Sequence, residues 1–147
     1  MVDRGTCMPA EARLHTLARQ LSARPASTSV TMAKRSPITT HVLDTSLGRP
    51  GAGIKVTLEQ QSGGAYSQIG SGTTDADGRV ATLLSVDHQL AAGIYRITFG
   101  TGEYMASTGR KCFYPEASIT FEVENPAEHF HVPLLLNPFG FSTYRGS

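Results

Sequence analysis

The stretch GIKVTLEQ, residues 53–60, alternates apolar and polar side chains with a period of two. Successive side chains of an extended chain point to opposite faces, so Ile54, Val56 and Leu58 share one face. The polar residues between them share the other face. This period is that of a half-buried strand and not that of an amphipathic helix. Residues 53–60 are therefore predicted to form a strand.

The same alternation recurs in residues 94–99 and 118–124, and segments rich in Gly, Pro, Asn and Asp separate the three runs. The Asp-Gly pair at 77–78 is a predicted hairpin corner, because Gly accepts a positive φ. Short strands at this spacing predict an all-β sandwich or barrel. Residues 86–92 and 102–108 are the segments of the body that can hold a helical turn or two.

Length and composition narrow the classes of protein. The chain has 147 residues, with 15 Gly, 8 Pro and 2 Cys. That length is typical of one domain, and two cysteines are too few for a disulfide scaffold. The sequence contains no apolar run near the roughly 20 residues that span a bilayer, so no membrane segment is predicted.

Charge divides the chain at about residue 36. Residues 1–36 contain six basic and two acidic side chains, a net charge of +4, whereas residues 37–147 contain seven basic and ten acidic ones, a net charge of −3. Such an asymmetry predicts a tail with its own task and a separate folded body. The mildly acidic body gives no indication of nucleic-acid binding.

The tail has the composition of a targeting segment followed by a linker. Residues 14–21 place apolar side chains at helical spacing, and residues 22–34 are rich in Ser and Thr. An Arg-rich, acid-poor segment is typical of a mitochondrial presequence. The pairs Arg13-Leu14 and Gln20-Leu21, with five residues between them, also resemble the type 2 peroxisomal targeting signal. A disordered N-terminus without an address is the third interpretation.

Histidines are the main candidates for chemistry. His129 and His131 flank Phe130, so in a strand they would project to the same side, and His41 lies in another alternating run. One interpretation is a zinc site built from His41, His129 and His131 with an open position for water. The other is metal-free acid–base catalysis by imidazole, which titrates near neutral pH. A Ser-His-Asp site is disfavoured because the chain has no GxSxG turn.

The C-terminal segment, residues 139–147, is aromatic and alternating up to its last residues. Chain termini are usually polar and frayed. This segment instead predicts a strand that runs to the end of the chain and gives Tyr144, Arg145 and Ser147 defined positions, with an edge strand and a loose tip as the alternative.

Five motifs together resemble 5-hydroxyisourate hydrolase, the transthyretin-related member of the transthyretin fold family. They are ITTHVLD (38–44), TDADGR (74–79), FYP (113–115), FHVPLLL (130–136) and the terminal YRGS (144–147). The match covers nearly all of residues 37–147. The terminal YRGS is the most specific motif, because it separates the hydrolases from the hormone carrier transthyretin. One departure is Asn137, where many relatives have Ser before Pro.

The resemblance implies a transthyretin-like β-sandwich of two four-stranded sheets with one short helix. It also implies a homotetramer whose active sites lie in the channel at the dimer–dimer interface. No metal or other cofactor is implied, which weighs against the zinc interpretation. His129 is not a family catalytic position, and it is interpreted as a rim or structural histidine.

The family's functional positions fall on five residues of this chain: His41, Arg79, His131, Tyr144 and Ser147. The implied reaction is hydrolysis of 5-hydroxyisourate to 2-oxo-4-hydroxy-4-carboxy-5-ureidoimidazoline in urate degradation. We expect His41, Arg79, His131 and Ser147 to be catalytic, and His41, Arg79 and Tyr144 to bind substrate. One imidazole would be the general base while the other orients water or supplies a proton; the sequence does not say which. Arg79 would stabilise the oxyanion.

Two other functions remain open from sequence. The first is a small-ligand carrier of the transthyretin type without catalysis, and the second is an interaction module.

The implied chemistry also bears on the subcellular location of the protein. If Ser147 belongs to the site, the C-terminus cannot carry a peroxisomal SKL-type signal. We therefore expect a peroxisomal protein, delivered by an import receptor that binds Arg13–Leu21, with the mitochondrion and the cytosol as alternatives.

Overall fold

The computed structural model describes residues 35–147. The targeting signal expected at Arg13–Leu21, the helix expected at 14–21 and the linker expected at 22–34 lie outside the described residues. The boundary expected between residues 36 and 37 therefore remains a prediction.

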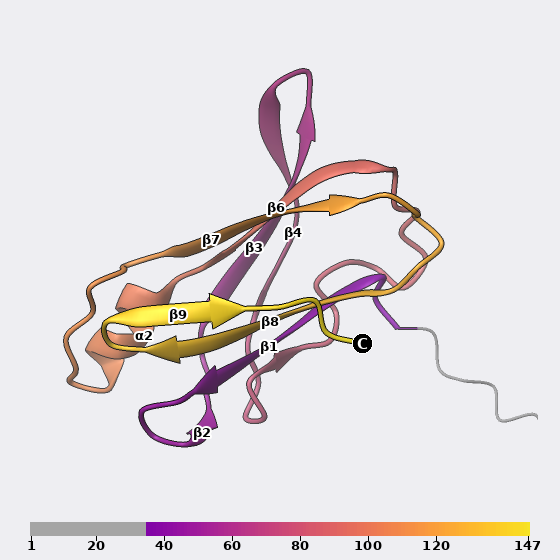
Figure 1. The fold of residues 1–147 in the computed structure, drawn as a ribbon. Coiled ribbons are helices and arrows are strands. Elements are labelled where there is room, and N and C mark those ends of the chain that lie inside the picture. Colours follow the sequence, from indigo (N-terminus) through magenta and orange to yellow (C-terminus); the bar gives the residue numbers. More distant parts are fainter. Residues whose placement is uncertain (1–34) are drawn as a thin grey trace, which may run out of the picture. The chain divides into compact units, whose positions relative to one another are not determined.

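The described chain folds into two β-sheets and one short helix (Figure 1). The strands are β1 (Ile38–Asp44), β2 (Arg49–Pro50), β3 (Lys55–Ser62), β4 (Ala65–Thr73), β5 (Arg79–Val80), β6 (Gly93–Phe99), β7 (Ala117–Val123), β8 (Phe130–Asn137) and β9 (Gly140–Thr143). One sheet has the order β2-β1-β8-β9, with β5 also paired to β1, and the other has the order β4-β3-β6-β7. The predicted all-β sandwich is confirmed.

Alternation decides which side chains enter the core between the sheets. Ile54, Val56 and Leu58 are all at most 1% exposed, as their period of two predicts, and Lys55 is exposed. Strand β6 buries Tyr95, Ile97 and Phe99 in the same way. Burying each large apolar side chain contributes about 1.5–3 kcal/mol, so these strands hold the two sheets together.

The two sheets differ from the expected pair of four-stranded sheets in one respect. The sheet β4-β3-β6-β7 has four strands, whereas the other has five, because two-residue strands β2 and β5 both pair with β1. The turn predicted at 77–78 is present, with Gly78 at φ +74° and its N–H donating to the Asp75 carbonyl at 2.9 Å. It is not a hairpin corner, because β4 and β5 belong to different sheets.

The helix α2 (Thr101–Ser107) lies where residues 102–108 predicted a helical turn. Its Tyr104 and Met105 are buried in the core. The helical turn predicted at residues 86–92 is absent, because the described chain has turns and irregular backbone there. Its isolated Leu90 enters the core without a repeating apolar stripe to stabilise a helix.

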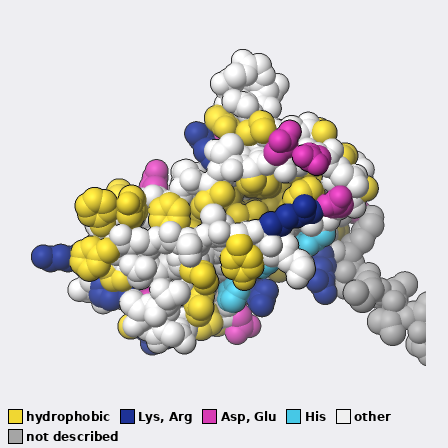
Figure 2. Space-filling model, in the orientation of Figure 1, with side chains coloured by type: hydrophobic (Ala, Val, Ile, Leu, Met, Phe, Trp, Pro, Cys, Tyr) yellow, Lys and Arg dark blue, Asp and Glu magenta, His cyan; other side chains and the backbone are white. Residues whose placement is uncertain are grey.

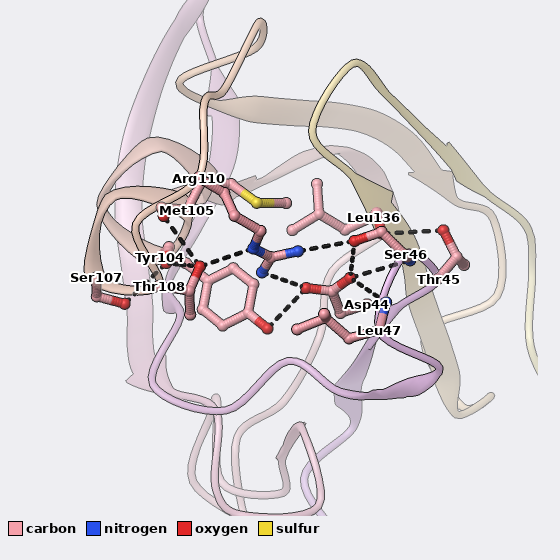
Figure 3. Close-up of polar contacts among 10 residues, drawn as sticks. All are labelled: Asp44, Thr45, Ser46, Leu47, Tyr104, Met105, Ser107, Thr108, Arg110 and Leu136. Carbon is pink, nitrogen blue, oxygen red and sulfur yellow. Dashed lines mark hydrogen bonds and ion pairs between the residues drawn. The ribbon is translucent and has the colours of Figure 1, made fainter.

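A buried ion pair ties the end of β1 to the chain just after α2 (Figure 3). Asp44 is fully buried and accepts hydrogen bonds from Tyr104 Oη at 2.9 Å, Ser46 Oγ at 2.6 Å and Arg110 Nη2 at 2.5 Å. Burial by itself raises the pKa of the Asp44 carboxyl, but these donors outweigh it and hold the pKa well below its usual range. Asp44 is therefore ionised at neutral pH.

Within residues 35–147, no helix is long and apolar enough to cross a membrane.

Candidate active site

Strand register gathers the predicted site residues on the outer face of the five-stranded sheet. Strands β1 and β8 pair in parallel, with Thr39 opposite His131 and His41 opposite Pro133. On its other edge, β1 pairs with β5, which places Arg79 opposite His41. Along β1, the alternation buries Thr40 and exposes the neighbouring positions partly. His41, Arg79 and His131 therefore come from three adjacent strands.

The loop before β5 fixes the backbone of Arg79. The side chain of Asp75 accepts hydrogen bonds from the N–H groups of Asp77 at 3.0 Å and Arg79 at 2.8 Å. Asp75 N–H in turn donates to the Arg79 carbonyl at 2.9 Å. The turn predicted at 77–78 therefore fixes the backbone that carries the Arg79 side chain. This turn needs glycine at position 78 for two reasons. The residue has a positive φ, and a Cβ there would lie 2.4 Å from the Val42 carbonyl oxygen.

The C-terminus lies against His131. Gly146 N–H donates to the His131 carbonyl at 2.9 Å and the two residues form an isolated antiparallel bridge. A Cβ on residue 146 would lie 2.4 Å from His131 Cδ2, so only glycine allows this approach without moving the imidazole. The contact explains the glycine of the terminal YRGS motif. It also brings Ser147 to the site.

An open cavity of about 460 Å³ lies where these elements meet. Its lining includes Arg79, His131 and Ser147, three of the four predicted catalytic residues. His41 is half-buried on the same sheet face but is not part of the lining. Tyr144 is 58% exposed and lines a neighbouring cavity of about 280 Å³, which His131 also borders. Tyr144 and His131 therefore share a cavity that does not include Arg79 or Ser147.

Positive charge dominates the cavity. Histidine and basic side chains lie next to one another on the face shown in Figure 2, close to the C-terminus. Burial lowers the pKa of the His131 imidazole below its usual value of 6.5, and the charges of Arg79, His129 and His41 lower it further. His131 is therefore neutral at neutral pH and able to accept a proton. The surroundings suit a substrate that carries or develops negative charge.

Several residues of the lining have no predicted catalytic or substrate-binding role, among them Arg35, Thr39 and His129. Thr39 is found only through the β1–β8 register, since it lies 92 positions from His131. His129 had a sequence signal, its spacing of two from His131, and was interpreted as a rim residue. Arg35 is the first described residue of the chain and carries no motif.

The zinc alternative has no ligand set in this geometry. Within residues 35–147, no group of three or more His, Cys, Asp or Glu side chains is arranged to hold a metal ion. The imidazoles are instead engaged by hydrogen bonds: the His131 and His129 rings both contact the Thr39 hydroxyl.

Comparisons with known proteins agree with the fold and the motifs. The model of the HIUase/Transthyretin family matches residues 38–146. The "Uric acid degradation bifunctional protein TTL" of Arabidopsis thaliana is 50% identical over 126 residues; the match covers 77% of this chain and 38% of that protein. The chain thus spans about two-fifths of the plant protein's length. The "5-hydroxyisourate hydrolase" of Salmonella dublin is 39% identical over 134 residues, covering 90% of this chain and 98% of the relative.

A solved structure of a relative shares the fold of this chain. The 5-hydroxyisourate hydrolase of Klebsiella pneumoniae superposes with a TM-score of 0.66 at 38% sequence identity, covering 75% of this chain and 98% of that chain. The resemblance inferred from five motifs is confirmed by these matches. The chain belongs to the HIUase/transthyretin family.

Proposed function

We propose that this protein is a hydrolase that opens the ring of 5-hydroxyisourate in urate degradation. The observation that carries the proposal is one open cavity that combines Arg79, the imidazole of His131 and the terminal Ser147. Relatives at 39–50% identity are named for this reaction or for uric acid degradation. A carrier site has no need for a guanidinium and a proton acceptor on the same cavity wall.

The geometry supports the following division of roles. His131 Nε2 takes a proton from water while the water oxygen adds to a ring carbonyl carbon, and Arg79 stabilises the oxyanion that forms. The carbon–nitrogen bond of the cyclic amide then breaks, and the proton passes to the leaving nitrogen. His41, which is paired with Arg79 across β1 and β5, orients the water, or receives the proton from His131 and passes it on to the leaving nitrogen. Ser147 contacts water or substrate through its hydroxyl or its terminal carboxylate.

The test is the ultraviolet absorbance decay of 5-hydroxyisourate generated from urate with urate oxidase. We expect wild type to accelerate the decay, and Arg79→Met to lose about 10²–10³ of kcat because one oxyanion donor is removed. Arg49→Met, which changes an exposed arginine of β2 outside the cavity, is the matched control. A folded wild type that leaves the spontaneous decay unchanged would contradict the hydrolase and favour the carrier.

We also propose a homotetramer whose sites lie where two sheets of neighbouring copies face each other. Its support is the outer face of the five-stranded sheet, where Leu43 and Leu135 are opposite each other beside the site and are each only half-buried. A second copy would remove this apolar surface from water. Light scattering should then give four times the 15.7 kDa mass of one chain, and a monomer would overturn this arrangement.

The subcellular location is proposed from the sequence, since the targeting signal expected at Arg13–Leu21 lies outside the described residues. Residues 1–36 would bring the protein to the peroxisome through the import receptor that binds Arg13–Leu21. Removing residues 1–34, which keeps Arg35 and Ser36 of the cavity lining, should move a fluorescent fusion to the cytosol and leave hydrolysis unchanged. Import of the full-length fusion into mitochondria would refute the peroxisomal address.

A further inference from the structure

One hydroxyl links His131 of β8 to His129, which lies just before that strand. Thr39 Oγ1 lies 2.9 Å from His131 Nδ1 and 3.1 Å from His129 Nε2. The arrangement follows from the fold, because Thr39 is opposite His131 in the parallel pair and His129 precedes His131 by two positions. Both bonds have the length of ordinary hydrogen bonds. Nδ1 of His131 is thereby occupied, which leaves Nε2 for water or substrate.

Proton counting allows this bridge three neutral arrangements, because a hydroxyl donates one proton and can accept two. A hydroxyl has a single proton to donate, and a neutral imidazole has one N–H and one acceptor nitrogen. In the first arrangement, His131 Nδ1–H donates to Thr39, and the Thr39 O–H donates to His129 Nε2. In the second arrangement, both bonds run the other way, and His131 carries its proton on Nε2. In the third arrangement, both imidazoles donate to Thr39, whose own proton then needs another acceptor. The first and the third leave a lone pair on His131 Nε2 for a proton from water, and the first also gives the Thr39 proton an acceptor, His129 Nε2.

We propose that Thr39 and His129 are positioning residues that hold His131 in the tautomer with its proton on Nδ1. The proposal rests on the hydrolase function above and adds the two groups that prepare the general base. The exposed ring of His129 can keep its own proton on Nδ1, where solvent accepts it, and offer Nε2 to Thr39. The half-buried His131 depends on Thr39 as the acceptor for Nδ1–H. A hydrogen-bond acceptor on one ring nitrogen of a histidine fixes which of the two nitrogens carries the proton.

The bridge also links the protonation of His129 to Thr39. A protonated His129 donates from both nitrogens, so it no longer accepts the Thr39 proton, and the first arrangement is lost. Several other charged or titratable groups face His131 or line the two cavities it borders: Arg79 from β5, His41 from β1, Arg35, Glu122 of β7, Tyr144, Arg145 and the carboxylate of Ser147.

Removing the hydroxyl while keeping the shape of the side chain tests the bridge. We expect Thr39→Val to lower kcat by about ten- to a hundred-fold with KM unchanged, since outer-sphere partners typically contribute that much. Thr39→Ser should restore most of kcat, because it returns the hydroxyl. Thr120→Val, at an exposed threonine of β7 in the other sheet, is the matched control and should behave as wild type.

A double-mutant cycle tests whether His129 acts through Thr39. His129→Ala should lower kcat in wild type but have no further effect in the Thr39→Val background, because the link is already absent. Independent effects that multiply in the double variant would overturn the coupling. Equal kcat for wild type and Thr39→Val would overturn the bridge while leaving the hydrolase assignment intact, since wild type must be active in the same assay.

Nitrogen-15 NMR of the imidazoles reads the tautomer without any turnover. We expect His131 of wild type to carry its proton on Nδ1 at pH 8, and Thr39→Val to shift it toward Nε2. A wild-type His131 protonated on Nε2 would overturn the proposal even if the enzyme were active. An inactive wild type with the expected tautomer would locate the failure in the proposed function instead.

Discussion

Replacing His131 by glutamine is expected to lower kcat/KM for 5-hydroxyisourate by about 10²–10⁴, the usual contribution of a positioned acid–base group. Glutamine has a similar volume and can hydrogen-bond, but it cannot accept a proton from water at neutral pH. His131 is half-buried beside Gly146 and Thr39, so the substitution should leave the fold intact. Absorbance decay of the substrate measures the loss, and circular dichroism checks the fold.

The control for this variant is His88→Gln, since His88 lies between β5 and β6 and lines neither of the cavities that His131 borders. Wild-type activity in His131→Gln would remove the imidazole from the mechanism. The wild-type pH profile gives a second check. Because the pKa of His131 is lowered, its neutral form persists as the pH falls through 6.5, and kcat/KM should fall only at lower pH.

Replacing Arg110 by methionine is expected to lower the free energy of unfolding by about 3 kcal/mol, the loss typical of a buried ion pair that loses one partner. Asp44 is fully buried, and only 19% of the Arg110 side chain is exposed. Without the guanidinium, the carboxylate keeps Ser46 and Tyr104 as donors but has no compensating charge. Urea denaturation at pH 7 measures the change, with Lys111→Met as the exposed neighbouring control.

The effect of Arg110→Met should depend on pH in a defined direction. The folded pKa of Asp44 is depressed, so the stability it contributes is fully present above its unfolded value of 3.8. That contribution is lost as the pH falls from 3.8 toward the folded pKa. The difference between wild type and variant should therefore shrink on acidification. A difference that is constant from pH 7 to pH 3 would place the effect in packing and not in the charge pair.

Local sequence patterns predicted the strands well because their physical cause is local. Alternation along 53–60 places Val56 and Leu58 in the core whichever strand pairs with them. The turn at 77–78 likewise follows from the freedom of Gly78. The helical turn predicted at 86–92 is absent because that segment has no repeating apolar pattern, only the isolated burial of Leu90. The motifs identified His131, Arg79 and Ser147, and the structure places all three on one cavity.

The all-β class, the core faces of the strands and the family follow from the amino-acid sequence. Three features follow only from the folded chain: the sheet that receives β5, the position of Gly146 against His131, and the link from His131 through Thr39 to His129. The two groups differ in the sequence distance over which their causes act. Side-chain period and turn chemistry act over a few residues, whereas Thr39 and His131 are 92 positions apart and meet through the register of a parallel strand pair. That register is set by the packing of the whole sandwich, so no local pattern specifies it.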